Sequence, residues 1–196
     1  MKFIFPKQMV IGLTGGMLSG KSTVLKLFEK KGAFTLSCDD LVREISLRAD
    51  VKKKIEKLFG GSEKQFLAQK IFNNPTARIQ LERLLHPLLL QEISQRLKAD
   101  KTLLRVVEVP LLFEAELEDY FDLTLAVAAP QKMLLKRLAY RKVKKEDFEK
   151  RSIVQFSQEK KMALADLSLL NDGSLGQLEE KVDHIYQAIL KIYQVK

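Results

Sequence analysis

The apolar positions of this chain fall into short continuous runs, separated by stretches with helical spacing. Residues 9–14 are apolar apart from Gly12 and Thr14, which is typical of a strand buried on both faces of a sheet. Residues 21–31 have apolar positions at helical spacing and are followed by Gly32, a residue favoured just beyond the end of a helix. The pattern therefore predicts a buried strand followed by a helix.

Four further runs have the same buried character and predict the rest of a sheet. They are residues 33–36, 105–110, 123–128 and 167–170. Helical patterns separate these runs, and the last helix is expected over residues 175–193, packed against the sheet. Parallel strands need crossover connections, which are usually helices, so we expect an α/β fold with a parallel sheet.

Residues 41–101 are too long for a single crossover between neighbouring strands. The segment is helical and charged in pattern, with breaks at Gly60-Gly61 and at Asn73-Asn74-Pro75. A long helical stretch then has its apolar side at Leu81, Leu84, Leu85, Leu88, Leu89, Ile93 and Leu97. His86-Pro87 is expected to interrupt that stretch, because proline removes a helical hydrogen bond. We interpret the segment as an inserted helical lobe that covers a substrate.

The first strand and the first helix are joined by Gly15-Gly16-Met17-Leu18-Ser19-Gly20-Lys21-Ser22-Thr23. This string fits G-x-x-x-x-G-K-[S/T], the phosphate-binding loop, in its expected place between a strand and a helix. Its glycines let backbone N–H groups point at phosphate oxygens, and the new helix adds the positive end of its dipole. Lys21 is expected to reach the β- and γ-phosphates, and the Ser22 hydroxyl to bind Mg²⁺. The string predicts a nucleoside triphosphate site.

Acidic side chains follow two of the predicted strands. Ligands bind beyond the carboxyl ends of parallel strands, so Asp39 and Asp40 are expected at the same edge as the phosphate loop. Capping of the next helix is the alternative role for each of them. Glu108 is either a ligand of Mg²⁺ or its waters, or an acid that faces solvent. Residues 111–114 then place apolar side chains beside a carboxylate in the same crevice.

The net charge of +9 predicts anionic partners. Residues 131–161 hold eleven Lys/Arg and four Asp/Glu, so this segment carries +7 of the total. Arg137 and Arg141 share a helix face at i,i+4 spacing, and Arg151 follows on a second helix expected over residues 145–164. The segment is either a lid whose guanidinium groups clamp phosphate or a solvated basic face. No nucleic-acid-binding motif is visible in it.

Composition narrows the class of protein. A chain of 196 residues is expected to be one α/β domain with inserts, or a domain with a small second lobe. No apolar run approaches the length of a membrane-spanning helix, and the start has too short an apolar stretch for a signal peptide. The single cysteine, Cys38, excludes an intramolecular disulfide and fits a reducing compartment. We expect a cytoplasmic monomer or small homo-oligomer without nucleic-acid or membrane partners.

In this order and spacing, the segments resemble dephospho-coenzyme A kinases over nearly the whole chain. The matching pieces are Leu13 to Thr23, Cys38-Asp39 with Arg43 and Glu44, Phe72-Asn73-Asn74-Pro75, Leu85-His86-Pro87, Val109-Pro110-Leu111-Leu112-Phe113-Glu114, Leu135-Lys136-Arg137-Leu138 with Arg141, Gln155, and Ala165-Asp166 with Asn171. The phosphate loop alone indicates only a nucleotide. The V-P-L-L-F-E string and the H-P dipeptide make the resemblance specific to this family.

The resemblance implies phosphorylation of the ribose 3′-hydroxyl of dephospho-CoA by ATP with Mg²⁺, the final step of coenzyme A biosynthesis. It also implies a P-loop NTPase fold, with a five-stranded parallel sheet and helices on both faces. The nucleotide-binding core would comprise residues 1–40, 102–130 and 162–196. Residues 41–101 would be the CoA-binding lobe, and residues 131–161 the lid.

The resemblance assigns roles to individual residues as well. Asp39 would take the proton from the 3′-hydroxyl, while Lys21 and the loop amides hold the ATP phosphates. Arg141 would clamp phosphate groups with support from Arg137, and Asn171 would lie near the adenine. The acceptor site would be formed by Asp39, Arg43, His86, Leu111, Leu112, Phe113 and Glu114.

Five positions depart from the family pattern: Leu18, Ser37, Glu108, Lys142 and Leu170. Leu18 stands where glycine is common, and leucine would be strained there if the position requires positive φ. Ser37 replaces the first aspartate of the usual pair, so Asp39 remains as the base. Glu108 is one methylene longer than the usual aspartate but still able to reach a metal-bound water.

Two other functions fit parts of the pattern. Another P-loop small-molecule kinase, such as a nucleoside monophosphate kinase, shares the sheet, the loop and a basic lid but does not require the V-P-L-L-F-E string. A basic nucleic-acid-binding or regulatory protein, whose loop only senses nucleotide, would bind RNA or DNA with steep salt dependence.

Overall fold

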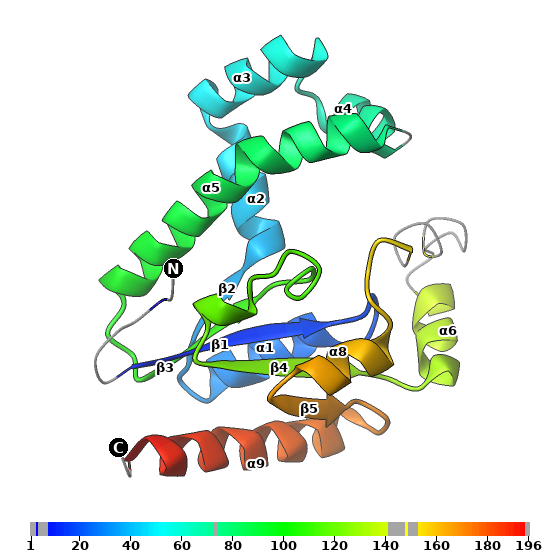
Figure 1. Cartoon of the computed structure of the whole chain (residues 1–196). Coiled ribbons are helices and arrows are strands. Elements are labelled where there is room, and N and C mark those ends of the chain that lie inside the picture. The colour runs from blue at the N-terminus through cyan, green and yellow to red at the C-terminus, as the bar shows by residue number, and fades with distance from the viewer. Residues whose placement is uncertain (1–2, 4–7, 73, 141–147, 149–152, 195–196) are drawn as a thin grey trace. The chain divides into compact units, whose positions relative to one another are not determined.

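The computed structural model describes residues 3, 8–72, 74–140, 148 and 153–194 (Figure 1). The chain forms two compact units, Met1–Ser37 with Asp100–Lys196, and Cys38–Ala99. The first unit contains the sheet, and the second is helical. Each helix in the described residues is too short or too polar to cross a membrane.

The first unit is built on a five-stranded sheet in which all neighbouring strands are parallel. The strands are β1 (Met9–Gly15), β2 (Phe34–Ser37), β3 (Leu104–Glu108), β4 (Leu123–Ala128) and β5 (Leu167–Leu170). Their order across the sheet is β2-β3-β1-β4-β5, which confirms the predicted parallel sheet. β1 lies between β3 and β4. The chain passes from β1 to the β2-β3 side of the sheet and from β3 to the β4-β5 side, and parallel sheets bind ligands at the point where the strand order reverses in this way.

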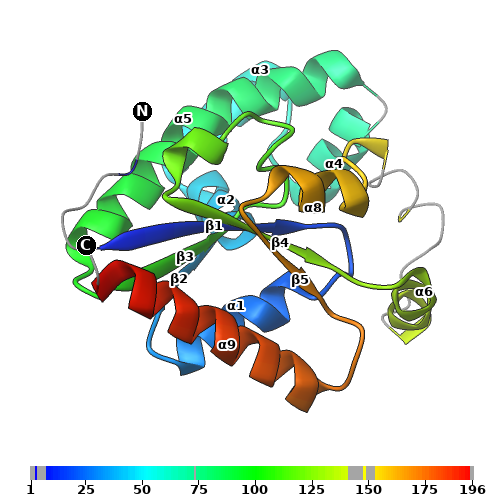
Figure 2. The ribbon, with the colours of Figure 1, turned by 60° about the horizontal axis from the view of Figure 1, so that its bottom comes forward.

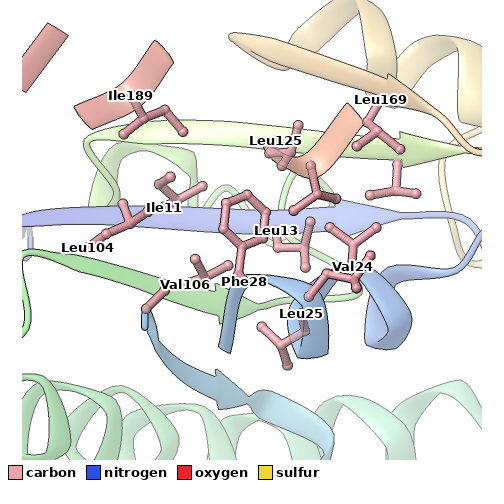
Figure 3. Packing of buried hydrophobic residues seen from close by; sticks show 14 of the residues in the cluster. Ile11, Leu13, Val24, Leu25, Phe28, Leu104, Val106, Leu125, Leu169 and Ile189 are labelled. Atoms are coloured by element: carbon pink, nitrogen blue, oxygen red, sulfur yellow. The ribbon is translucent and has the colours of Figure 1, made fainter. Parts of the chain in front are cut away.

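Two helices cover one face of the sheet. They are α1 (Lys21–Lys30) and α9 (Leu175–Gln194), which lie together below the sheet in Figure 2. Ile11 and Leu13 of β1 share the core with Phe28 of α1, whose ring lies 6.4 Å from that of Tyr186 on α9. Figure 3 shows Ile11, Leu13 and Phe28 packed together beside β1 and α1. This core fixes the first turn of α1 to the end of β1.

The opposite face is covered by α8 (Gln158–Leu164) and by the segment that follows β3 (Figure 2). A Cβ atom on Gly12 would lie 2.5 Å from Leu112 Cδ1 and 2.8 Å from Phe121 Cδ2. Glycine therefore lets Leu112 and Phe121 pack directly on the backbone of β1. The predicted sheet with helices on both faces is confirmed.

The basic segment contains a helix, α6 (Gln131–Tyr140), as predicted. The single helix predicted over residues 145–164 is wrong, because residues 154–157 are not helical. The backbone N–H of Lys160 donates to the Ser157 hydroxyl at 3.2 Å, so Ser157 caps the start of α8. A serine N-cap favours a new helix start over continuation. Arg141, Lys142 and Arg151 lie outside the described residues.

The second unit consists of α2 (Cys38–Leu47), α3 (Ala49–Phe59), α4 (Lys64–Phe72) and α5 (Pro75–Ala99). The breaks predicted at Gly60 and before Pro75 are confirmed. α5 continues through Pro87, so the predicted interruption is wrong. The proline costs a hydrogen bond, but α5 packs on α2 and α4 and buries Leu85, Leu89, Ile93 and Leu97 along one side. Tertiary packing of an apolar face outweighs local propensity.

The turn between β1 and α1 has an unusual backbone. Gly20 has φ 107°, and a Cβ there would lie 2.2 Å from Asn171 Nδ2, so only glycine fits. Leu18 has φ 64°, in the left-handed region. For a residue with a Cβ atom this conformation costs roughly 1–2 kcal/mol. The strain expected for leucine at a positive-φ position is therefore present.

Replacing Leu18 by glycine removes that backbone penalty. Leu18→Ala is the matched control, because it also truncates the side chain but keeps a Cβ atom at positive φ. We expect Leu18→Gly to have a free energy of unfolding about 1 kcal/mol above that of Leu18→Ala, measured by urea denaturation. Equal free energies for the two variants would mean that positive φ costs nothing at this position.

Candidate active site

The loop after β1 brings together an ammonium group, a hydroxyl and a carboxylate. Lys21 Nζ donates to the carbonyl of Gly16 at 2.9 Å, so the side chain lies over its own loop. The hydroxyl of Ser22 donates to Glu108 Oε1 at 3.3 Å. Glu108 ends β3 beside Leu13 of β1 and is buried, whereas Ser22 is exposed. Lys21, Ser22 and Glu108, which the sequence predicted for the nucleotide site, therefore lie beyond or at the carboxyl ends of the neighbouring strands β1 and β3.

Ser22 and Glu108 supply oxygen donors of the kind that Mg²⁺ prefers. Mg²⁺ usually keeps several waters and is bound by one or two protein oxygens together with substrate phosphates. Among the described residues, no group of three or more His, Cys, Asp or Glu side chains is placed to hold a metal. Two protein oxygens beside a phosphate loop fit a Mg²⁺ ion shared with a bound nucleotide.

Two side chains from distant parts of the chain hold the backbone of the loop. Arg137 Nη1 on α6 donates to the carbonyls of Leu18, at 2.9 Å, and Ser19, at 3.0 Å. Asn171, directly after β5, is buried and donates from Nδ2 to the Ser19 carbonyl at 2.8 Å. The resemblance implies ATP contacts for both residues, which stay a prediction. Their observed contacts position the backbone of the loop.

The string after β3 packs into the first unit. Leu112 is fully buried over Gly12, and Phe113 is buried as well, while Leu111 is half-buried. In this conformation Leu112 exposes no surface to a ligand, and Phe113 is only 5% exposed. The side chain of Glu114 is 10% exposed.

The carboxylate of Glu114 contacts a backbone N–H group just before α8 and a lysine side chain on α8. Its Oε1 atom accepts a hydrogen bond from the backbone N–H of Phe156 at 2.6 Å. The same oxygen lies 3.0 Å from Lys161 Nζ. The acidic end of the V-P-L-L-F-E string thus joins the segment after β3 to the segment that precedes β5.

Lys161 is a buried member of the site that the sequence did not reveal. Its side chain is 0% exposed, and Nζ lies 2.6 Å from the Pro110 carbonyl and 3.4 Å from Thr14 Oγ1, besides the Glu114 contact. Burial lowers the pKa of the Lys161 ammonium from its usual value, and the Glu114 carboxylate opposes that shift. The adjacent Lys160 is exposed, and nothing in the sequence distinguishes the two lysines.

The remaining predicted residues lie in the second unit. Asp39 is exposed in the first turn of α2, two residues after the end of β2. A carboxylate at this position also interacts favourably with the positive end of the helix dipole. Asp40 forms an exposed ion pair with Arg43 at 2.8 Å. His86 is exposed on α5.

Comparison with known proteins identifies the family. A family model described as dephospho-CoA kinase matches residues 9–177. The dephospho-CoA kinase of Frankia casuarinae is 30% identical over 190 residues, which cover 92% of this chain and 83% of that protein. The dephospho-CoA kinase of Protochlamydia amoebophila is 32% identical over 197 residues, which cover 93% of this chain and 97% of that protein.

Solved structures share the fold. TT1252 from Thermus thermophilus has a TM-score of 0.83 at 30% identity, covering 92% of this chain and 97% of that one. The dephospho-CoA kinase from Campylobacter jejuni has a TM-score of 0.63 at 23% identity, covering 93% and 98%. With its P-loop kinase fold and a family match over most of its length, the chain belongs to the dephospho-CoA kinase family and is an ATP-dependent kinase.

Proposed function

We propose that the chain transfers the γ-phosphoryl group of ATP to the ribose 3′-hydroxyl of dephospho-CoA, which gives coenzyme A and ADP. Family membership supports this acceptor. The observation that best supports a site for ATP, the phosphoryl donor, is the hydrogen bond from Ser22 in the first turn of α1 to Glu108. The single cysteine supports a cytoplasmic location, because disulfides are rare in that compartment.

In phosphoryl transfer the protein mainly positions groups and neutralises charge. The N–H groups of residues 15–23 and the N-terminus of α1 would hold the ATP phosphates. Lys21 donates to the carbonyl of Gly16, so its ammonium group lies over the loop. From there it would contact the β- and γ-phosphates, where its charge would stabilise the transition state.

Ser22 and Glu108 would hold Mg²⁺, Glu108 either directly or through a water molecule. When bound, Mg²⁺ neutralises charge on the phosphate oxygens. Ser22 and Glu108 are joined by a hydrogen bond and follow or end neighbouring strands, so their oxygens are already close before any ion binds. This arrangement lowers the cost of organising the site.

On the acceptor side the proposal rests on the family resemblance. Asp39 would accept the proton of the 3′-hydroxyl, and Arg43 and His86 would contact the acceptor. The resemblance also assigns to the acceptor site Leu111, Leu112, Phe113 and Glu114. It assigns the lid to residues 131–161, with Arg141 clamping phosphate, whereas α8 at the end of this segment packs on β1 and β4.

The alternative function is that of a nucleoside monophosphate kinase, and a comparison of acceptors distinguishes it from the proposed function. We expect ADP release from ATP to require dephospho-CoA and to be absent with AMP, CMP or shikimate. A coupled ADP assay measures this directly, with ATP alone as the baseline. Rapid ADP release with AMP and none with dephospho-CoA would contradict the proposed function.

Asp39→Asn tests the assignment of the base. The variant keeps the shape of the side chain but cannot take a proton, so kcat should fall by roughly 10²–10⁴ while the Kd for ATP stays unchanged. Asp50→Asn is the control, because Asp50 is an exposed aspartate in the first turn of α3 with no role in the proposed site, and it should keep near-native turnover. Near-native kcat for Asp39→Asn would exclude Asp39 as the base.

Glu108→Gln and Ser22→Ala test the proposed Mg²⁺ site. Each removes one oxygen ligand or its support, so the Mg²⁺ concentration at half-maximal activity should rise by about 10- to 100-fold. Ser22→Thr keeps the hydroxyl, which the loop motif accepts, and should retain the native Mg²⁺ dependence. Unchanged Mg²⁺ dependence in both of the first two variants would remove these residues from the metal site.

A further inference from the structure

The ammonium group of Lys161 joins two segments that are far apart in the sequence. One is the end of β1, through Thr14 Oγ1 at 3.4 Å. The other is the string after β3, through the Pro110 carbonyl at 2.6 Å and Glu114 Oε1 at 3.0 Å. Thr14 is followed directly by Gly15, where the phosphate loop begins. A single buried cation therefore sits at the base of that loop.

Stability alone is a poor explanation for this charge. Lys161 is 0% exposed and the Glu114 side chain is 10% exposed, so both groups have lost most of their hydration. Apolar residues of similar volume often replace a buried ion pair with no loss of stability. The ammonium group instead offers three donors at fixed places, which suits a role in holding several segments in one geometry.

A second residue of α8 holds the neighbouring edge of the site. Gln158 Oε1 accepts from the N–H of Ala129 at 2.9 Å, and Gln158 Nε2 donates to the carbonyl of Ala129 at 3.1 Å. A Cβ atom on Gly16 would lie 3.0 Å from Gln158 Cγ, so this side chain also borders the phosphate loop. One short helix thus bridges the ends of β1 and β4 and the string after β3.

We propose that Lys161 is a positioning residue for phosphoryl transfer, which fixes the start of the phosphate loop relative to Glu114. The inference rests on the proposed function, because it deepens the account of the same site. Lys161 holds groups on both sides of the reaction rather than the substrates themselves. Its loss should therefore lower kcat more than it raises the KM for ATP.

The test compares variants that separate charge balance from positioning. Lys161→Met leaves the Glu114 carboxylate buried without its cation, so its urea midpoint should fall. The double variant Lys161→Met/Glu114→Gln carries no charge at this site. The amide oxygen of the glutamine that replaces Glu114 would still accept a hydrogen bond from the N–H of Phe156, so the double variant should recover most of the urea midpoint that Lys161→Met loses. Its kcat should nevertheless stay at least tenfold below the native value, with a KM for ATP within about threefold.

Two further variants complete the set. Lys160→Met removes an exposed lysine of the same helix, whose ammonium lies over the ring of Phe156, and should match the native chain in kcat and midpoint. Thr14→Val keeps the shape of the side chain and removes its hydroxyl, which breaks the contact with Lys161 Nζ and the hydrogen bond that Thr14 Oγ1 donates to the Pro110 carbonyl at 3.4 Å. It should fold like the native chain, with kcat lowered by about threefold or more.

Native kcat in the double variant or in Thr14→Val would overturn the proposal, since Lys161 would then only balance the charge of Glu114. A defect confined to the KM for ATP would overturn it too. The native chain tests the proposed function separately. If it phosphorylates an acceptor other than dephospho-CoA, the ratios of variant to native kcat with that acceptor still decide the role of Lys161.

Discussion

The carbonyl groups of Leu18 and Ser19 need donors from outside the phosphate loop. Arg137 and Asn171 supply these donors from α6 and from the end of β5, so the loop takes its shape only when the sheet and both flanking elements are in place. Three such hydrogen bonds, each worth about 1 kcal/mol net or more, are enough to hold Leu18 in its left-handed conformation. These hydrogen bonds use carbonyl groups of the loop, so they do not compete with phosphate for its N–H groups.

Charge is used in two ways in this molecule. Among the described residues, most lysine and arginine side chains are exposed or half-buried, where they favour polyphosphate ligands in general. A few charged side chains that are buried or half-buried give the site its geometry. Glu108 meets Ser22 at the end of β3, and Lys161 meets Glu114 on the face that carries α8. Long-range attraction and local positioning are thus supplied by different residues.

The sequence allowed prediction of the five strands, the phosphate loop and the helical insert, because each depends on local periodicity or on a short motif. It misjudged Pro87, where packing of α5 overrides a local helix breaker, and Ser157, whose capping hydroxyl starts a new helix. The partners of Arg137 were hidden because backbone carbonyls leave no trace in a sequence. Lys161 was hidden because burial of one of two adjacent lysines depends on tertiary structure.

The central claim is that the donor site defined by Ser22, Glu108 and the phosphate loop serves phosphorylation of one particular hydroxyl. The most direct measurement is the identity of the product formed from ATP and dephospho-CoA, by mass and by phosphorus NMR. The account predicts one added phosphoryl group, at the ribose 3′ position, with one ADP formed for each. A phosphoryl group at another position, or consumption of ATP without any phosphorylated acceptor, would contradict it.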